Sequence, residues 1–438
     1  MKTVYLAEKP SQASDIANVL GIKRRGDGFI EVAGGDIVTF ARGHLVELAE
    51  PKEYKEEWGG RWTFDHLPLV PPGGAWKYNV NKKTSGQLKT IREQLKTADR
   101  CVIATDAGRE GELIARLILE HCKFKGPVER FWTSSLTPHD IKVALGKLLP
   151  GAAKIPLFEA ARARQHMDWA YGFSLSRAAT LAADIRGRTF PMGRVQTPTL
   201  ALVVRRFLEI QNFDAKEYFE LEATVKTKAG KEFKMWHAPD EANRIREKSA
   251  AAALAAKARG ASAAINVVKE SSKEAPALPF SLPKLQKAAN GALGFSASKT
   301  LEVAQKLYEM KATTYPRTDC PYLAESQKAD VPDILRNLAG HFPAMVAKVN
   351  SRGTVLRKST FDDASLTDHH GIIPTSLSVS LSGDELALFT LIAQRFMQTV
   401  SPDCLFDKTT VKLDANGVPF KATGKVVTDP GWQAIKLV

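Results

Sequence analysis

The first 150 residues contain two strand–turn–helix units, and this repeated pattern restricts the fold more than any other feature. A buried strand is predicted over residues 3–7, followed by the break Glu8–Ser11 and by apolar residues at helical spacing. A second apolar run, residues 100–105, leads through a turn into a predicted helix over residues 110–120. Units of this kind predict an open, mostly parallel α/β sheet.

The rest of the chain changes from helical to β-type patterns and back. Residues 155–212 have a helical pattern, as do residues 282–310 and 383–400. Residues 218–236 and 408–438 instead alternate apolar and polar side chains, as half-buried strands do. We therefore expect a multidomain fold of α/β, α and β parts, in which a helical domain is inserted into a β-rich domain.

Composition narrows the class of protein without identifying it. The 438 residues include 62 Lys and Arg against 48 Asp and Glu, and the net charge of +14 favours a polyanionic partner without requiring one. Four scattered cysteines without a Cys-x-x-Cys pair argue against a disulfide framework or a cysteine zinc site. The sequence has no run of about 18 apolar residues and no apolar signal segment, so we expect a cytoplasmic protein that contacts no membrane.

Acidic side chains follow both predicted strands. Glu8 comes directly after the first strand, and Asp106, Glu110 and Glu112 lie in or after the turn that follows the second. Because ligands of open α/β sheets bind outside the carboxyl ends of the strands, these carboxylates suit Mg²⁺. The alternative is that Asp106 caps the helix and the glutamates stabilise its positive end. The glycines and arginine of this run, together with Glu8-Lys9 at the matching position, favour the metal site.

A tyrosine lies in the segment Thr313–Asp319, directly after a predicted helix. Pro316 biases Tyr315 away from helical conformation and places it in a loop. A phenol with a pKa near 10 is a weak nucleophile at neutral pH and needs a cation beside it. Arg317 is suited to bind a phosphate there. Taken alone, the segment fits a packed tyrosine beside a surface arginine better than a nucleophile.

Three further segments carry imidazoles, cations or amides. Asp368–Thr375 contains adjacent histidines, which fit a phosphate contact or a packed loop better than a zinc site, because neighbours on a strand point to opposite faces. Arg162–Asp168 and Gly193–Thr197 suit single-stranded nucleic acid, although a solvated helix face also explains the arginines of the former. The sequence contains no G-x-x-x-x-G-K-[ST] loop and no G-x-S-x-G elbow, so ATP-driven work and serine hydrolysis lack support.

Together these motifs resemble those of the type IA DNA topoisomerases, in particular the bacterial and plasmid topoisomerase III branch. Ala7–Ser11 resembles the N-terminal motif of that branch, Thr105–Leu113 the acidic motif of its Toprim domain, and Thr314–Asp319 its active-site tyrosine motif. Further motifs in the family's order are Gly43–Leu45, Gly193–Thr197, residues 279–280 with 285–286, and His369–Thr375. The resemblance extends from residue 3 to about residue 434.

The resemblance implies a toroidal clamp of four parts around a hole wide enough for DNA. Residues 1–150 would form the Toprim domain, and residues 151–213 an incomplete helical domain that grips single-stranded DNA. The helical domain with the active-site tyrosine would span residues 277–404. A β-rich arch would combine residues 214–276 with the truncated segment 405–438. The family further implies a monomer.

The resemblance also implies an ATP-independent reaction on single-stranded segments of negatively supercoiled or catenated DNA. Tyr315 would attack a phosphodiester to form a 5′-phosphotyrosine, another strand would pass through the break, and the free 3′-hydroxyl would reseal it. Glu8 would move a proton at the leaving oxygen, while Lys9 and Arg317 would stabilise the transferring phosphate and His369 would contact it. No nucleotide cofactor would be needed.

The metal and the DNA would be held by further motif residues. The resemblance implies Mg²⁺ as the cofactor, bound by Asp106, Glu110 and Glu8. The DNA-binding positions that it implies are Arg164, Asp168, Arg194, Gln196, His44 and Asp319. Many relatives carry Asp-x-Asp-x-Glu where this chain has Gly108, so we expect weaker metal binding with more water.

The end of the sequence leaves a second function open. The chain stops at Val438, where chains of this family normally continue into the rest of the DNA-gripping domain. The alternative is therefore a truncated DNA-binding remnant that binds or cleaves DNA without completing strand passage. A different Toprim enzyme, such as a primase or nuclease, is disfavoured by the motif around Tyr315. Whether relaxation or decatenation dominates stays open.

Overall fold

The computed structural model describes residues 1–185 and 187–436. Its N-terminal part is an α/β domain around a seven-stranded sheet of order β2-β3-β4-β1-β7-β8-β9, in which β1 pairs in parallel with both β4 and β7. The strands are β1 (Thr3–Ala7), β2 (Ile22–Gly26), β3 (Phe29–Val32), β4 (Ile37–Phe40), β7 (Arg100–Ala104), β8 (Val128–Arg130) and β9 (Leu149–Pro150). The two expected strands are thus neighbours at the centre of the sheet.

Alternation along β1 separates two cores on opposite faces of the sheet. Val4 and Leu6 pack with helices α2 (Ser85–Lys96) and α3 (Arg109–His121). Tyr5 and Ala7 pack with α1 (Pro10–Leu20) and α4 (Pro138–Leu145). Successive strand residues point to opposite faces, so a fully apolar strand such as β1 requires helices on both sides. The expectation of an open α/β sheet is confirmed, but only its centre is parallel: β2·β3, β3·β4 and β8·β9 pair antiparallel, so the sheet is mixed.

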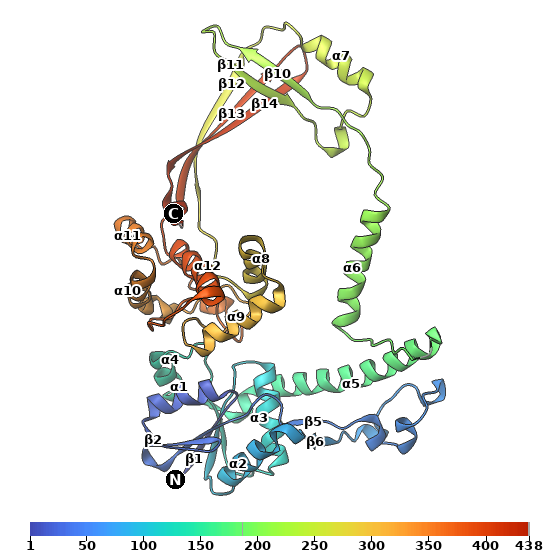
Figure 1. Cartoon of the computed structure of the whole chain (residues 1–438), viewed down its shortest axis with the longest axis vertical. Coiled ribbons are helices and arrows are strands. Elements are labelled where there is room, and N and C mark those ends of the chain that lie inside the picture. The colour runs from blue at the N-terminus through green and yellow to red at the C-terminus, as the bar shows by residue number, and fades with distance from the viewer. Residues whose placement is uncertain (186, 437–438) are drawn as a thin grey trace.

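The segment between β4 and α2 extends away from this domain and runs beside helix α5 (Ile155–Ala183), as Figure 1 shows. It contains the hairpin of β5 (Val46–Leu48) and β6 (Tyr78–Val80), and its small core joins Trp58 and Leu69 to Trp169 of α5. Within the described residues, no helix is both long enough and apolar enough to span a membrane.

The β-rich material forms one antiparallel sheet of order β10-β11-β14-β13-β12. Its strands are β10 (Leu221–Lys226), β11 (Glu232–His237), β12 (Ile265–Glu274), β13 (Cys404–Asp414) and β14 (Pro419–Asp429), and α7 (Lys248–Ala258) packs beside them. The register of β12 on β13 runs from Ile265↔Leu413 to Glu274↔Cys404. Two segments far apart in sequence therefore build one sheet, as the sequence pattern predicts.

The inserted helical domain has its own core. It consists of α8 (Leu282–Leu293), α9 (Ala297–Glu309), α10 (Val331–His341), α11 (Pro343–Arg352) and α12 (Gly383–Thr399). The expected alternation to residue 438 is wrong at its end, because β14 stops at Asp429 and Gly431–Ala434 is a short 3-10 turn. Ile435 is fully buried in the helical core, which takes it out of any sheet pattern. Residues 437 and 438 lie outside the described residues.

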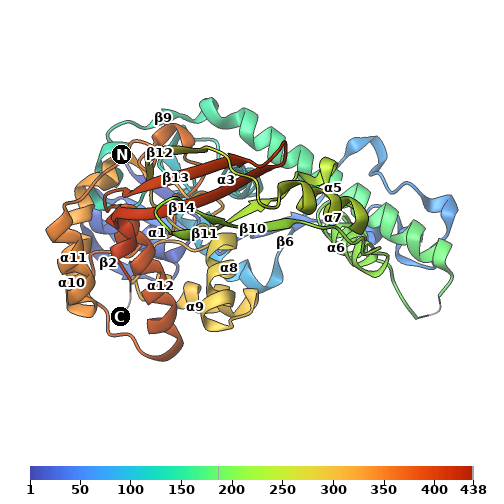
Figure 2. The same ribbon diagram turned by 90° about the horizontal axis from the view of Figure 1, so that it is seen from above.

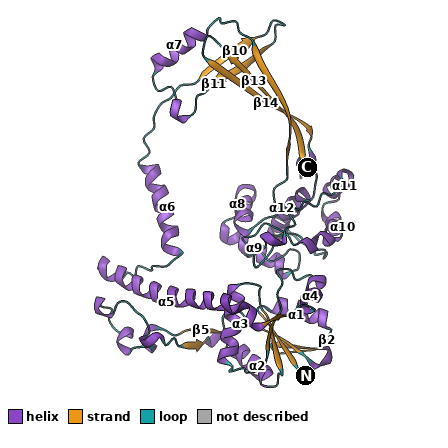
Figure 3. Ribbon diagram, turned by 180° about the vertical axis from the view of Figure 1, so that it is seen from behind, coloured by secondary structure: helices purple, strands orange, loops and turns teal. Residues whose placement is uncertain are grey.

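Figures 1 and 3 show how these parts follow one another. The helical domain lies on the α/β domain, and the antiparallel sheet at the far end of the molecule reaches down to the helical domain through its strands β12, β13 and β14. On the other side α5 leads to α6 (Gln196–Gln211), which connects to the same sheet. Seen from above, the antiparallel sheet extends over both the helical domain and α5 (Figure 2).

Candidate active site

The carboxyl ends of β1 and β7 bring the two acidic turns together. Ala7 and Ala104 are register partners, so Glu8 and Asp106 emerge at the same edge of the sheet. The Asp106 backbone N–H donates to Glu8 Oε2 at 3.3 Å. Lys9 precedes α1 in extended conformation, and its side chain projects to the same point.

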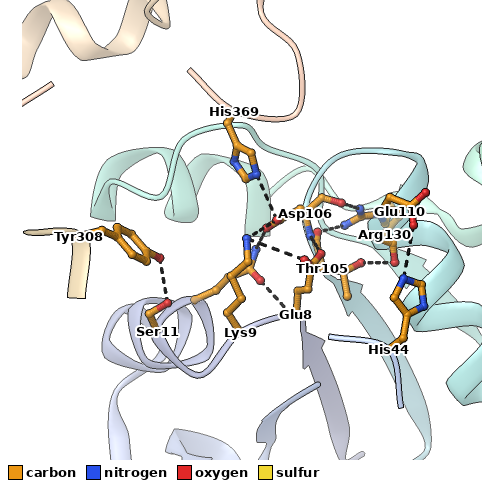
Figure 4. A network of polar contacts seen from close by, with 12 residues as sticks. Glu8, Lys9, Ser11, His44, Thr105, Asp106, Glu110, Arg130, Tyr308 and His369 are labelled. Atoms are coloured by element: carbon orange, nitrogen blue, oxygen red, sulfur yellow. Dashed lines mark hydrogen bonds and ion pairs between the residues drawn. The ribbon is translucent and has the colours of Figure 1, made fainter. Parts of the chain in front are cut away.

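Lys9 links the two carboxylates, as Figure 4 shows. Its Nζ lies 2.6 Å from Asp106 Oδ2 and 3.8 Å from Glu8 Oε1. His369, from the helical domain, places Nε2 3.2 Å from the same Asp106 oxygen. Gln12 of α1 donates to the second oxygen of Asp106 at 3.2 Å. Asp106 is therefore the centre of a mostly buried network that joins two domains.

Burial and charge shift the pKa values of these groups in different directions. Burial, reinforced by the charge of Asp106, raises the pKa of Glu8, so this carboxyl retains a proton more readily than an exposed glutamate. Burial alone would lower the pKa of Lys9, but Asp106 and Glu8 outweigh it and raise that pKa to about 12. Burial would likewise raise the pKa of Asp106, but His369 and Lys9 hold it well below its usual range. The site therefore pairs a proton-retaining carboxyl with a permanent cation.

Tyr315 packs directly on this network. Tyr315 lies in the loop after α9, directly before Pro316. The Lys9 ammonium lies 3.9 Å from the centre of the Tyr315 ring. The rings of Tyr315 and His369 are 4.6 Å apart, and Tyr308 of α9 packs edge-on against Tyr315 at 5.2 Å. The other domain thus places a cation against the face of the Tyr315 ring.

Two polar contacts hold α9 and the residues after it against α1. The hydroxyls of Tyr308 and Ser11 are 2.9 Å apart, as drawn in Figure 4. Lys311 forms an ion pair with Asp15 at 3.1 Å. These contacts fix the distance between the tyrosine loop and the acidic turns.

Two cavities adjoin the network. One, of about 590 Å³, is lined by Lys9, Asp106 and Tyr315 among others. The second, of about 950 Å³, is lined by Gly108, Arg109, Arg317 and Asp319 among others. Both are lined by Asp368 and His369, so the loop that carries these residues separates the two spaces. Arg317 lines the second cavity, whereas Lys9 and Asp106 line the first.

Glu110 belongs to a separate cluster. It forms an ion pair with Arg164 of α5, and His44 Nε2 lies 3.4 Å from its other carboxylate oxygen. Burial lowers the pKa of His44, which favours the neutral imidazole. The structure therefore unites two of the predicted DNA-binding residues with one predicted metal ligand.

The predicted metal ligands are placed at one edge of the sheet but are not drawn into one coordination shell. Within residues 1–185 and 187–436, no three His, Cys, Asp or Glu side chains are arranged to hold a metal ion. Glu8 and Asp106 nevertheless offer the hard oxygen donors that Mg²⁺ prefers, and the Lys9 ammonium between them marks a position that accepts a cation. The carboxylate donors therefore fit Mg²⁺. In this structure Asp106 forms an ion pair with Lys9, and Glu110 forms one with Arg164.

The remaining predicted DNA contacts lie toward α6. Arg194 binds Asp168 of α5 through two hydrogen bonds, Nε to Oδ1 at 2.8 Å and Nη2 to Oδ2 at 3.1 Å. The hydrogen bond from Arg194 lowers the pKa of Asp168. Gln196 is exposed at the first residue of α6. These three residues form a polar surface between α5 and α6, apart from the tyrosine.

The residues that hold the turn of Asp106 in place were not predicted from sequence. Arg130 is fully buried at the end of β8 and forms an ion pair with fully buried Glu112 of α3. It also donates to the backbone carbonyls of Thr105 at 2.9 Å and Asp106 at 2.6 Å, which fixes the turn. Glu112 was a candidate acid at the sheet edge, but it faces the interior. A lone arginine after a short strand carries no signal that separates this role from a surface position.

Known proteins resemble this chain over almost its whole length. A family model described as DNA topoisomerase matches residues 152–437, and one described as Toprim domain matches residues 3–136. DNA topoisomerase 3 of Bacillus subtilis strain 168 is 38% identical over 445 residues, and that of Bacillus licheniformis is 39% identical. Each alignment covers 99% of this chain and 59% of the relative, so the chain spans about three fifths of their length.

The fold also has a solved counterpart. Full-length topoisomerase I from Thermotoga maritima aligns with a TM-score of 0.64 over 99% of this chain and 67% of that chain. At 22% identity the likeness concerns the fold alone.

Proposed function

This chain belongs to the type IA DNA topoisomerase family, and from that premise we propose that it cleaves and reseals single-stranded DNA through Tyr315 without ATP. The observation that carries the proposal is the packing of Tyr315 between Lys9 of the Toprim domain and His369 of its own domain. A phenol in this position has a permanent cation beside it and an open cavity in front of it. Both are needed for attack on a phosphodiester.

Cleavage exchanges one phosphate ester for another. The Tyr315 oxygen attacks phosphorus and releases its proton to solvent, the bond from phosphorus to the 3′-oxygen breaks, and that oxygen takes a proton from Glu8. The raised pKa of Glu8 suits it to this role, because the carboxyl stays protonated further toward neutral pH. In resealing, ionised Glu8 accepts the proton of the 3′-hydroxyl as its oxygen attacks phosphorus, the bond from phosphorus to Tyr315 breaks, and the phenolate takes up a proton from solvent.

Negative charge develops on the phosphate oxygens during both steps. Lys9 remains charged throughout the physiological range because its pKa is about 12, and Asp106 orients it. His369 is held on Asp106 at the border of the two cavities, where an imidazole N–H can donate to a phosphate oxygen. Arg317 reaches the phosphate from the second cavity.

We also propose Mg²⁺ as the cofactor of the Toprim domain, bound by Glu8, Asp106 and Glu110. When bound, the ion supplies positive charge that neutralises and orients the DNA phosphate next to the 3′-end. Asp106 and Glu110 each compensate a basic side chain in this structure, Lys9 and Arg164 respectively. A phosphate backbone that takes over Arg164 would leave Glu110 free for the metal.

The proposed DNA path runs from α6 to the tyrosine. Arg164, Arg194 and Gln196 would contact the strand, with Asp168 orienting Arg194 and His44 and Asp319 lying beside the path. We propose that the Toprim domain (1–150), the gripping helices (151–213), the arch (214–276 with 405–438) and the tyrosine domain (277–404) form a toroidal clamp. We further propose that it acts as a cytoplasmic monomer on single-stranded segments of supercoiled or catenated DNA.

End-labelled oligonucleotides test the proposal. A single-stranded oligonucleotide labelled at its 3′-end should give labelled protein after denaturation, because the 5′-phosphate of the cleaved strand stays on Tyr315. The same oligonucleotide labelled at its 5′-end should not. The opposite labelling pattern would exclude a 5′-phosphotyrosine.

A specific observation favours a second function, that of a protein which binds and cleaves DNA without completing strand passage. In the described chain α6 buries none of its residues, although it carries a row of large apolar side chains. These are Leu200, Leu202, Val203, Val204, Phe207, Leu208 and Ile210. An apolar face of this extent marks a docking surface, and the described residues leave it uncovered. Adduct formation without relaxation of negatively supercoiled plasmid would establish this second function, and relaxation would exclude it.

A further inference from the structure

Position 108 requires a glycine because a neighbouring side chain occupies the place of its Cβ, and not because of its backbone conformation. Gly108 precedes α3 with φ −154° and ψ 178°, an extended conformation that any residue adopts. A Cβ atom built there would overlap the carboxylate of Asp368. The contact crosses domains, because Asp368 lies on the loop of the tyrosine domain and Gly108 on the acidic turn of the Toprim domain. The absence of a side chain at position 108 therefore leaves a space beside the start of α3, here called the notch, and the Asp368 carboxylate occupies it.

The surroundings of the notch suit a carboxylate. Gly108 is the residue that precedes α3, and it provides no side chain to cap the first turn of that helix. A negative group at a helix N-terminus is stabilised by the unpaired N–H groups there. Burial raises the pKa of Asp368 and Asp106 adds to the rise, while His369 and Arg109 act in the opposite direction. Two basic groups and the start of the helix therefore offset part of the cost of burying this carboxyl.

The position of Asp368 in the chain connects the notch to the reaction. The next residue is His369, whose Nε2 lies 3.2 Å from Asp106 Oδ2 and whose ring packs on Tyr315. Both Asp368 and His369 line the two cavities beside the tyrosine. A loop held at residue 368 is therefore held one residue away from the proposed phosphate contact.

We propose that Asp368 is a positioning residue: its carboxylate docks in the notch left by Gly108 and thereby fixes His369 on Asp106 when the tyrosine domain is closed on the Toprim domain. The effect on the reaction rests on the proposed function, whereas the docking contact does not. The space next to the start of α3 accommodates one side chain, either from residue 368 or from residue 108. Position 108 is therefore not a vacant ligand position to which an acid can simply be restored.

A double-mutant cycle tests this pairing through the rate of covalent adduct formation with a single-stranded oligonucleotide. Gly108→Ala should slow the reaction roughly tenfold to a hundredfold, as expected when a positioned group is displaced. Asp368→Ala should also slow it. The double variant should be no slower than Asp368→Ala alone, because removal of the carboxylate removes the clash. Gly86→Ala is the matched control, since a Cβ at Gly86 of α2 meets no atom within 4 Å.

An acid exchange separates positioning from mere packing. Gly108→Asp combined with Asp368→Ala returns a carboxylate to the same space but leaves the loop of His369 without its anchor, so it should recover little of the lost rate. Recovery by Gly108→Asp, and not by Gly108→Asn, in the Asp368→Ala background would show that a charge in the notch is sufficient and would overturn the positioning role. Fully multiplicative effects of Gly108→Ala and Asp368→Ala, or unchanged activity of Gly108→Ala, would overturn the proposal.

Hydrogen–deuterium exchange provides a measurement that does not depend on catalysis. Asp368→Ala and Gly108→Ala should each increase exchange in the segments 106–112 and 366–371, without additivity in the double variant. If the wild-type protein forms no adduct, the proposed function fails, and the exchange data still decide whether the two residues dock. If the wild type forms adduct but exchange is unchanged in both variants, the docking proposal alone fails.

Discussion

The Lys9 ammonium lies 2.6 Å from Asp106 Oδ2 and thereby stays charged in a mostly buried position against the Tyr315 ring. For the proposed tyrosine nucleophile, this arrangement supplies a cation before DNA binds, so that no reorganisation is needed. The pair comes from the turns after β1 and β7, which are neighbours in the sheet.

Replacement of Lys9 by Met should therefore remove charge stabilisation while keeping the length of the side chain. We expect adduct formation to fall by roughly 10²–10³-fold, the usual effect of losing one such donor. Single-turnover kinetics with an oligonucleotide measure this. Lys23→Met, at an exposed pair with Glu31, should leave the rate unchanged. Equal rates for Lys9→Met and wild type would remove Lys9 from the mechanism.

The pH dependence of cleavage should report Glu8. Because burial and Asp106 raise the pKa of Glu8, its protonated form persists to higher pH than for an ordinary glutamate. Adduct formation should therefore decrease as the pH rises through this raised pKa, while resealing, which needs ionised Glu8, should increase. Glu8→Gln should be slow in both directions and should lose this dependence. A Glu8→Gln variant that keeps the wild-type profile would assign the titration to another group.

The same shift predicts the effect of pH on stability. A carboxyl whose pKa is raised on folding destabilises the folded protein once it ionises, so Glu8 costs stability above its ordinary pKa and not below it. Thermal unfolding of Glu8→Gln and wild type should thus converge as the pH falls below about 4, where glutamate is protonated in both states. At neutral pH the variant should be the more stable of the two.

Arg130 should matter for stability although it contacts no predicted substrate. Its replacement by Met leaves the buried carboxylate of Glu112 with Arg116 alone and removes the donor to the Thr105 and Asp106 carbonyls, for which we expect a loss of about 3 kcal/mol in the free energy of unfolding. Arg100→Met breaks the partly exposed pair with Glu129 and should cost less than about 1 kcal/mol. Denaturant unfolding of the two variants compares them, and similar losses would contradict the role given to Arg130.

The ion pair of Glu110 and Arg164 predicts a gain of DNA affinity. Glu110→Gln removes the charge that holds Arg164, so binding of a single-stranded oligonucleotide without Mg²⁺ should tighten by a few-fold. Fluorescence anisotropy at fixed salt measures this. Glu120→Gln, which removes one of the two carboxylates paired with Arg162 of the same helix, is the matched control and should have a smaller effect. Weaker binding by Glu110→Gln would exclude Arg164 from the DNA path.

Much of the fold could be predicted because its signals are local. The apolar run of β1, the break after Ala7 and the helical spacing of α1 are all contained in the first 20 residues. The split of the β-rich sheet was also visible as alternation on both sides of a helical segment. The turn at Gly431 and the burial of Ile435 were not predicted, because they depend on packing against α12 in the folded helical domain.

The residues of the candidate site that belong to sequence motifs could be predicted, whereas the contacts between residues of different domains could not. Glu8, Lys9, Asp106, Tyr315 and His369 were each identified from sequence, and the structure brings these five together. Spacing alone could not reveal the contact of Lys9 with the Tyr315 ring, since it crosses two domains. Gly108 likewise stood out as a departure from the family pattern, but its partner Asp368 could be found only from the fold.

The central claim is that Tyr315 is the nucleophile, and the most direct test is to identify the residue bonded to DNA. After adduct formation, nuclease treatment and trypsin digestion, the peptide of residues 312–317 should carry a phosphonucleotide on its single tyrosine. Tyr315→Phe should give no adduct, while Tyr308→Phe, the neighbouring ring on α9, should still yield the modified peptide. A phosphonucleotide on another residue, or an adduct that persists in Tyr315→Phe, would contradict the account.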